Sequence, residues 1–209
     1  MTTTRTVPTA NGDARLCVDR SKSPMATLVL GHGAGGGAET RDLAALAKAL
    51  PAQGVSVFRV EQPWRVAGKK VAPAPRTLDQ AWVAVVNSLR PQTPLVVGGR
   101  SAGARVACRT ARQLGASGCL ALAFPLNPPS TPGRTRIDEL LEARVPTLVV
   151  QGDRDVFGKP DDFPSTVDLT VVPGADHGFA TLKRGEVSQD EALGVLVEAV
   201  LEWITWEIA

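Results

Sequence analysis

Short apolar runs rich in Val, Leu and Ala alternate along the chain with longer segments in which apolar residues recur every three or four positions. The short runs lie at residues 26–30, 55–60, 94–97, 119–124, 145–151 and 168–172. Runs of this length predict buried strands, and the periodic segments between them predict helices. Such alternation is typical of βαβ units, so the pattern indicates an α/β fold: a mostly parallel sheet with helices on both faces.

Three periodic segments predict helices that pack one face on the sheet. The last of them begins at Ser188, which has Glu191 three residues later, the spacing of a capping box. The expected buried faces are Leu43, Leu46, Ala47 and Leu50; Leu78, Trp82, Val85 and Leu89; and Leu193, Val197, Val200, Ile204 and Ile208. Ahead of the first buried strand, residues 5–9 and 15–19 flank Asn11-Gly12, which predicts an antiparallel hairpin at one edge of the sheet.

The length of 209 residues and the 44% share of hydrophobic residues fit one globular domain over residues 1–209. Proline-rich stretches at 72–76 and 125–133 are expected to be loops within it. The net charge of +2 is scattered along the chain, so no nucleic-acid partner is indicated. No apolar run is long enough for a membrane span or a signal peptide, and we expect a cytoplasmic protein.

The three cysteines lie far apart without a C-x-x-C pair, a pattern that favours neither a metal site nor a disulfide. We expect Cys17, Cys108 and Cys119 to be small core residues. Nothing in the sequence calls for a metal or a cofactor.

A serine between two glycines follows the apolar run at 94–97. The segment Gly99-Arg100-Ser101-Ala102-Gly103 has the form G-x-S-x-G between a predicted strand and a predicted helix, the setting of a nucleophile elbow. Side chains at positions 99 and 103 would collide with each other or with neighbouring backbone on such a tight turn. Ser101 is therefore the candidate nucleophile.

A serine hydroxyl needs a base and an acid that orients the base. His177 follows the 168–172 strand, and Asp155 follows the 145–151 strand, which completes the chain order Ser, Asp, His of α/β-hydrolases. Asp153 remains the alternative acid. Asp176, adjacent to the histidine, is expected to form a turn, and His32 is expected to hold its own loop.

The glycine-rich loop of residues 31–37 follows the strand at 26–30. In this place a loop supplies one oxyanion-hole amide, and the residue after the nucleophile supplies the other. We expect these donors to be Ala34 and Ala102, with Gly33 and Gly35 as alternatives to Ala34. The expected apolar walls of a substrate pocket are Trp64, Leu126 and Phe179.

The same loop imitates a dinucleotide-binding fingerprint, because Gly31, Gly33 and Gly36 follow a strand and Glu61 ends the next one. The acid comes 30 residues after the first glycine, farther than the roughly 20 expected. A dinucleotide site would also leave the order of Ser101, Asp155 and His177 without a role.

The segments Gly31-His32-Gly33-Ala34, Gly98-Gly99-Arg100-Ser101, Phe124 to Pro129, Gly152 to Asp155 and Ala175 to His177 resemble the small lidless α/β-hydrolase-like family. That family includes many bacterial hydrolases and relatives of a subunit of an animal chromatin-acetylation complex; dienelactone hydrolases are more distantly similar. The resemblance implies an α/β-hydrolase fold with the triad Ser101, Asp155 and His177. The sequence departs from it at Asn127, where relatives often have His. Arg59, Arg100 and Arg105 also match, and we expect them to pair with acids such as Asp79 or Glu61, with Arg100 alternatively reaching the pocket.

Together these features predict a serine hydrolase that cleaves a small acyl ester, thioester or lactone through an acyl-enzyme on Ser101. Only residues 125–133 separate Phe124 from the helical pattern near Arg134, which leaves no room for a cap domain. An uncapped site favours small acyl substrates over long lipids. The alternatives are a catalytically silent module that binds a protein partner and, less favoured, a dinucleotide-binding oxidoreductase.

Overall fold

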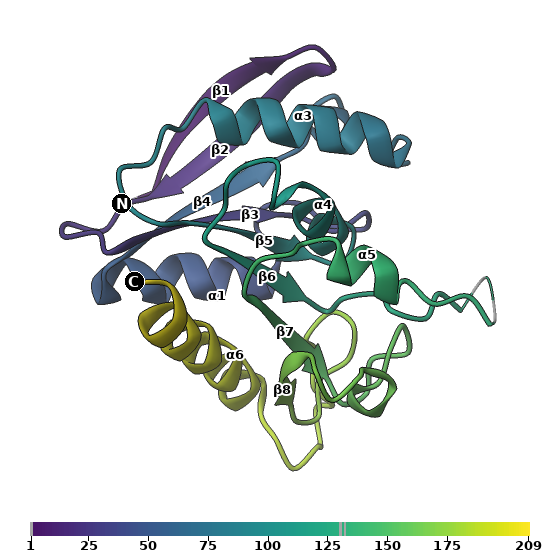
Figure 1. The fold of residues 1–209 in the computed structure, drawn as a ribbon. Helices are drawn as coiled ribbons and strands as arrows, with labels where there is room; N and C mark the ends of the chain where they lie inside the picture. Colours follow the sequence, from purple (N-terminus) through teal and green to yellow (C-terminus); the bar gives the residue numbers. More distant parts are fainter. Residues whose placement is uncertain (1, 130, 132) are drawn as a thin grey trace.

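The computed structural model describes residues 2–129, 131 and 133–209. In this part of the chain one sheet has the strand order β1-β2-β4-β3-β5-β6-β7-β8 (Figure 1). The strands are β1 (Thr3–Thr9), β2 (Gly12–Asp19), β3 (Ala26–Gly31), β4 (Val55–Glu61), β5 (Leu95–Arg100), β6 (Gly118–Leu122), β7 (Thr147–Gly152) and β8 (Asp168–Val172). All pairings among β3 to β8 are parallel, and β1 and β2 join antiparallel at one edge. The predicted α/β class and mixed edge are confirmed.

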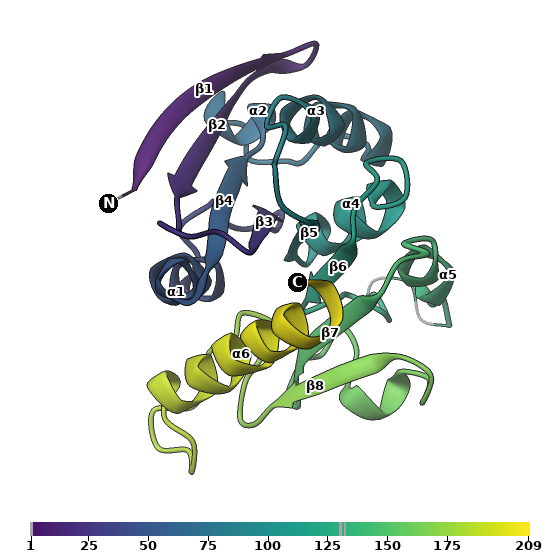
Figure 2. The same cartoon turned by 60° about the vertical axis from the view of Figure 1, so that its left-hand side comes forward.

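Helices cover both faces of the sheet. The helical segments are α1 (Arg41–Ala49), η1 (Leu50–Gln53), α2 (Pro63–Val66), α3 (Pro75–Asn87), α4 (Ala102–Thr110), α5 (Ile137–Leu141), η2 (Pro160–Asp162), α6 (Gln189–Trp203) and η3 (Ile204–Ile208). Figure 2 shows α3, α4 and α5 on one face and α1 with α6 on the other. Each face thus has its own apolar core.

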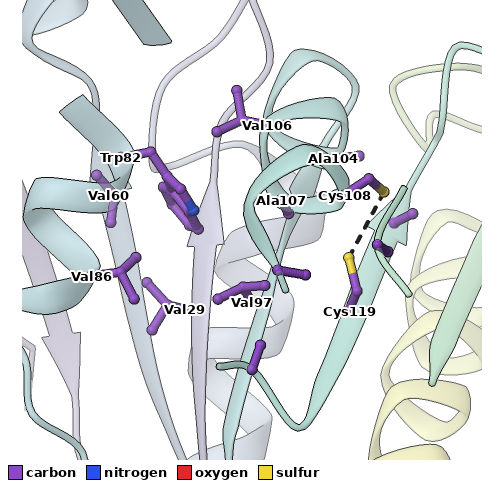
Figure 3. Packing of buried hydrophobic residues seen from close by; sticks show 14 of the residues in the cluster. Val29, Val60, Trp82, Val86, Val97, Ala104, Val106, Ala107, Cys108 and Cys119 are labelled. Atoms are coloured by element: carbon purple, nitrogen blue, oxygen red, sulfur yellow. Dashed lines mark hydrogen bonds between the residues drawn. The ribbon is translucent and has the colours of Figure 1, made fainter. Parts of the chain in front are cut away.

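The core beneath α3 and α4 surrounds Trp82, which is 1% exposed. Figure 3 shows its indole between α3 and the sheet, close to Val60 and Val86, while Val106 comes in from α4. The Sγ atoms of Cys108 and Cys119 lie 3.8 Å apart in the same core. All three cysteines are free and buried, as expected for small core residues.

The hairpin turn differs by one residue from the expectation. Thr9 pairs with Gly12, so Ala10 and Asn11 form the two-residue loop and Gly12 begins β2. The φ of Gly12 is 104°, a region that favours glycine. Asn11-Gly12 therefore marks the turn correctly, but Gly12 belongs to the strand.

The predicted capping box of the last helix is present. Ser188 Oγ accepts from the Glu191 amide at 3.2 Å, and Glu191 Oε2 accepts from the Ser188 amide at 2.8 Å. Val200 and Ile204 are buried as predicted, but the rest of the stripe is shifted, because the other buried residues are Ala192, Leu196 and Trp203. Leu193 and Val197 lie at the border of the buried face. Because apolar residues occupy adjacent positions along this helix, the sequence does not decide which face is buried, and the packing of the helix on the sheet decides it.

The connection from β6 to β7 holds α5 and irregular segments in the described residues. It contains the predicted loop 125–133, of which Ser130 and Pro132 lie outside the described residues. This connection is too short to hold a separate cap domain above the carboxyl ends of the strands. In the other proline-rich stretch, Pro75 is already the first residue of α3.

Candidate active site

Ser101 lies on the tight turn between β5 and α4. Its φ of 53° is unusual for a residue with a side chain, and its amide donates to the Leu122 carbonyl at 2.9 Å. A Cβ at Gly99 would lie 2.5 Å from the Gly31 carbonyl oxygen, and a Cβ at Gly103 would meet the same atom. Glycine is required at both positions because the elbow lies directly against the end of β3.

Three side chains from three different loops form a chain of hydrogen bonds. His177 Nε2 is 2.9 Å from Ser101 Oγ, and His177 Nδ1 is 2.8 Å from Asp155 Oδ2. The neutral imidazole with its proton on Nδ1 fits both contacts, since Nε2 is then free to accept the serine proton. The structure therefore brings together Ser101, His177 and Asp155.

Asp155 is fully buried, and its carboxylate accepts two further hydrogen bonds. Gln151 Nε2 donates to Oδ2 at 2.9 Å, and the Phe157 amide donates to Oδ1 at 2.8 Å. The Phe157 ring lies against the His177 ring, with centroids 4.3 Å apart. These contacts hold the carboxylate and the imidazole in one relative orientation.

The two other acids near this edge of the sheet have different positions. Asp153 is exposed. Asp176 Oδ1 accepts from the amides of Gly178 and Ala180 at 2.8 and 2.9 Å, so Asp176 shapes the turn that carries the histidine.

His32 holds the glycine loop. Its Nε2 accepts from the Gln62 amide at 3.1 Å, so Nδ1 carries the proton and donates to the Gly33 carbonyl at 2.8 Å. Burial lowers the pKa of His32, which favours this neutral form. The loop beside Ser101 is thereby fastened to the segment that follows β4.

Ala34 and Ala102, the two expected amide donors, line one small cavity. Trp64 also lines it, and the Trp64 ring lies 5.7 Å from the His32 ring. A Cβ at Gly33 would lie 3.4 Å from Ser101 Cβ, so the glycine loop directly adjoins the serine. Because α4 begins at Ala102, the positive end of its dipole also faces this place.

Leu126 and Phe179, the other two expected pocket residues, are placed in the core. Leu126 is 2% exposed in the core beneath α3 and α4, and Phe179 is fully buried in the core beneath α1 and α6. The aromatic side chain against the histidine is Phe157 instead. The signal in the sequence is its position two residues after Asp155, in the loop that carries the candidate acid.

Arg100 connects the elbow to the histidine loop. Its Nη2 donates to the His177 carbonyl at 3.0 Å, and its Nε is 3.7 Å from Oδ2 of Asp42, a fully buried residue in α1. The side chain is 14% exposed. Arg100 therefore contacts the backbone of the predicted base.

Arg59, Arg100 and Arg105 pair with acids as expected, but Asp79 and Glu61, the acids named as examples, are not their partners. Asp79 pairs with Arg109, and Glu61 pairs with Arg15 at 3.0 Å. Arg59 pairs with Asp19 and Glu39, and Arg105 pairs with Glu139, which Arg109 also contacts. Asn127 donates to Asp162 Oδ2 at 3.2 Å and its amide donates to the Phe157 carbonyl, so it ties neighbouring loops together.

The described ranges contain neither a candidate metal site nor a candidate membrane span. No group of three or more His, Cys, Asp or Glu side chains among residues 2–129, 131 and 133–209 is arranged to hold a metal ion. No helix in the same ranges has the length and apolar character needed to cross a membrane.

A family model described as an alpha/beta hydrolase domain matches residues 24–205. The chain belongs to this family. The match extends from just before β3 to the start of η3 and contains the elbow, the acid loop and the histidine loop. No curated protein gives a significant match to the sequence.

Solved structures with the same fold include a serine hydrolase without a lid. XC6422 from Xanthomonas campestris, an α/β serine hydrolase without a lid, has a TM-score of 0.76 and 21% identity, covering 97% of this chain and 94% of that one. An α/β serine hydrolase homologue from Coxiella burnetii has a TM-score of 0.75 and 20% identity, with coverages of 95% and 97%. Dienelactone hydrolase from Anabaena variabilis has a TM-score of 0.73 and 14% identity, with coverages of 100% and 99%. The expected likeness to lidless α/β hydrolases and dienelactone hydrolases is confirmed.

Proposed function

We propose that this protein is a serine hydrolase that cleaves a small acyl ester, thioester or lactone through an acyl-enzyme on Ser101. The observation that carries the proposal is the continuous hydrogen-bonded chain from Asp155 through His177 to Ser101, with distances of 2.8 and 2.9 Å. This is the arrangement in which an imidazole removes the serine proton as the oxygen attacks a carbonyl.

Each member of the chain has one role. Ser101 Oγ attacks the acyl carbon while His177 Nε2 takes its proton, and Asp155 keeps the imidazole in the reactive tautomer and stabilises it when charged. The amides of Ala34 and Ala102 stabilise the negative charge on the carbonyl oxygen. His177 then protonates the leaving group and activates the water that releases the acyl group.

The surroundings of Ser101 favour a small acyl group. The cavity beside Ala34 and Ala102 is small, and large side chains, including Trp64 and Trp82, line it. In the described part of the chain, the β6 to β7 connection supplies no cap domain that would cover a long apolar chain. A lactone, or an ester or thioester with a short acyl part, fits these walls.

The test uses a fluorophosphonate probe, which reacts with an activated serine and requires no knowledge of the substrate. We expect intact-mass spectrometry to show one adduct on the wild-type protein and none on Ser101→Ala, whose kcat on short esters falls by about 10⁶-fold. Ser117→Ala, a change at an exposed serine before β6, is the matched control and keeps the adduct. A folded wild-type protein without an adduct would contradict the proposal and favour the silent module.

A further inference from the structure

The cavity beside the predicted oxyanion amides is very small. Its walls include Ala34, Ala102 and Val106 together with Gln62, Trp64 and Trp82. Within this cavity, the centre of a water-sized sphere can occupy a volume of about 10 Å³. Roughly this volume is needed for one water-sized group. An acyl group whose carbonyl oxygen contacts the two amides can therefore place one or two further atoms there.

Three of these wall residues carry a buried polar atom that lacks a partner. Gln62 Oε1, Trp64 Nε1 and Trp82 Nε1 make no hydrogen bond to any described residue. The residues are 5%, 6% and 1% exposed, so bulk water does not reach them freely. Buried polar atoms in proteins are nearly always paired, so three unpaired ones on residues that line one cavity are a signal for a ligand. Gln62 and Trp64 also line a neighbouring cavity.

The side chains concerned are held in place by other contacts. The Gln62 side chain is held by its Nε2, which donates to the Leu78 carbonyl at 3.3 Å, and its backbone N–H donates to His32 Nε2. The side-chain oxygen, Oε1, is the atom without a partner. Figure 3 shows the Trp82 indole packed between α3 and the sheet. The Trp64 ring lies against His32.

The unpaired atoms comprise two donors and one acceptor. Each indole N–H donates, and the amide oxygen accepts. A hydroxyl group has one proton to donate and two lone pairs, so a single hydroxyl is the smallest group that complements all three. A methyl group fills the same space but leaves the three atoms unpaired, which carries a free-energy penalty.

We propose that this cavity is the acyl subsite and that it selects a short acyl group with a hydroxyl on the carbon next to the carbonyl, that is, a 2-hydroxyacyl group. The inference rests on the proposed function, because it requires an acyl group bound at Ser101. It goes beyond that function by naming the chemical class of the acyl part. Selection by a buried polar site of this kind is strong, since the analogue without the hydroxyl leaves the partners unpaired.

The test compares two acyl groups of equal size. Glycoloyl and propionyl thioesters of N-acetylcysteamine differ only in a hydroxyl in place of a methyl group. Each kcat/KM is divided by the rate constant of uncatalysed hydroxide hydrolysis, which corrects for the activating effect of the hydroxyl. We expect the corrected value for glycoloyl to exceed that for propionyl by at least about 10-fold. Equal values, or a preference for propionyl, would overturn the inference.

Three substitutions assign the preference to the cavity. Trp64→Phe and Trp82→Phe each remove one N–H, and Gln62→Met removes the acceptor at similar size. We expect each to lower the glycoloyl-to-propionyl ratio by about 5- to 10-fold, the effect of losing one hydrogen bond. Trp206→Phe, at a tryptophan that is 82% exposed, is the matched control and leaves the ratio unchanged. A ratio that none of the three cavity variants alters would also overturn the inference.

The outcomes separate the two proposals. If the wild-type protein takes up no fluorophosphonate, the proposed function fails. If it takes up the probe and hydrolyses both thioesters with equal corrected values, the proposed function stands and only the hydroxyl selection fails. Because the thioester comparison uses the wild-type protein, a cavity variant that does not fold still leaves the inference open to refutation.

Discussion

Two fully buried aspartates are connected to the histidine loop, Asp155 directly and Asp42 through Arg100, and their surroundings differ. The Asp155 carboxylate accepts from His177, from Gln151 and from the Phe157 amide. Neither oxygen of Asp42 has a hydrogen-bond partner among the described residues, and its nearby cation is Arg100, with 3.7 Å between Nε and Oδ2. One carboxylate is held by directional bonds and the other by attraction to a charge.

Because of this difference, the two aspartates are connected to different parts of the histidine loop. Hydrogen bonds from three directions fix the orientation of Asp155, and this orientation passes to the imidazole. Asp42 draws in the Arg100 guanidinium, whose Nη2 holds the His177 carbonyl. Burial raises the pKa of Asp42, and the Arg100 guanidinium opposes that rise. Asp155 therefore contacts the ring directly, whereas Asp42 is linked to the loop backbone through Arg100.

The largest expected effect comes from Asp155→Asn. An amide in this position favours the wrong imidazole tautomer, and we expect kcat to fall by about 10⁴-fold. Steady-state hydrolysis of a short ester measures the effect. Asp153→Asn, in the same loop but exposed, is the control and stays within a few-fold of wild type. The reverse ranking would transfer the orienting role to Asp153.

A smaller effect is expected from Arg100→Met. Loss of the contact to the His177 carbonyl shifts the imidazole relative to Ser101, and a displacement of this kind lowers kcat by about 10- to 100-fold with little change in KM. Rates are expressed per serine that the fluorophosphonate labels, which removes any loss from unfolded protein. Arg105→Met breaks an ion pair with Glu139 on the outer side of α4 and is the matched control. Equal losses in both variants would assign Arg100 to stability alone.

The smallest effect is a pH dependence of stability at Asp42. Burial raises the pKa of Asp42 in the native state above its value in the unfolded chain. At pH values between these two pKa values, the native state therefore binds more protons at Asp42 than the unfolded state does. The contribution of Asp42 to the free energy of unfolding consequently increases as the pH falls through this range. Urea unfolding of wild type and Asp42→Asn at several pH values measures it. We expect the free energy of unfolding of the wild type minus that of Asp42→Asn to rise as the pH is lowered. A difference that falls on acidification would contradict the raised pKa.

The strands and the order of the candidate site residues were predictable because their signals are local. Apolar runs located the parallel strands, and the flanking glycines located the elbow at Ser101. The carboxyl ends of parallel strands meet at one edge of the sheet, so the loops that carry Asp155 and His177 were expected to lie near the serine. The capping box at Ser188 is equally local, since its two partners are three residues apart.

The sequence by itself determined the fold class, the elbow and the order of serine, acid and histidine, because periodicity and turn chemistry are properties of neighbouring residues. Only the tertiary structure decided the partners of Asp79 and Glu61, the stripe that α6 buries and the position of Phe157 against His177. It also brought Gln62, Trp64 and Trp82, each with an unpaired buried polar atom, to the lining of one cavity. Many acids, aromatic residues and helix faces satisfy the same sequence pattern, and the choice among them depends on distances of a few ångströms between segments far apart in the chain.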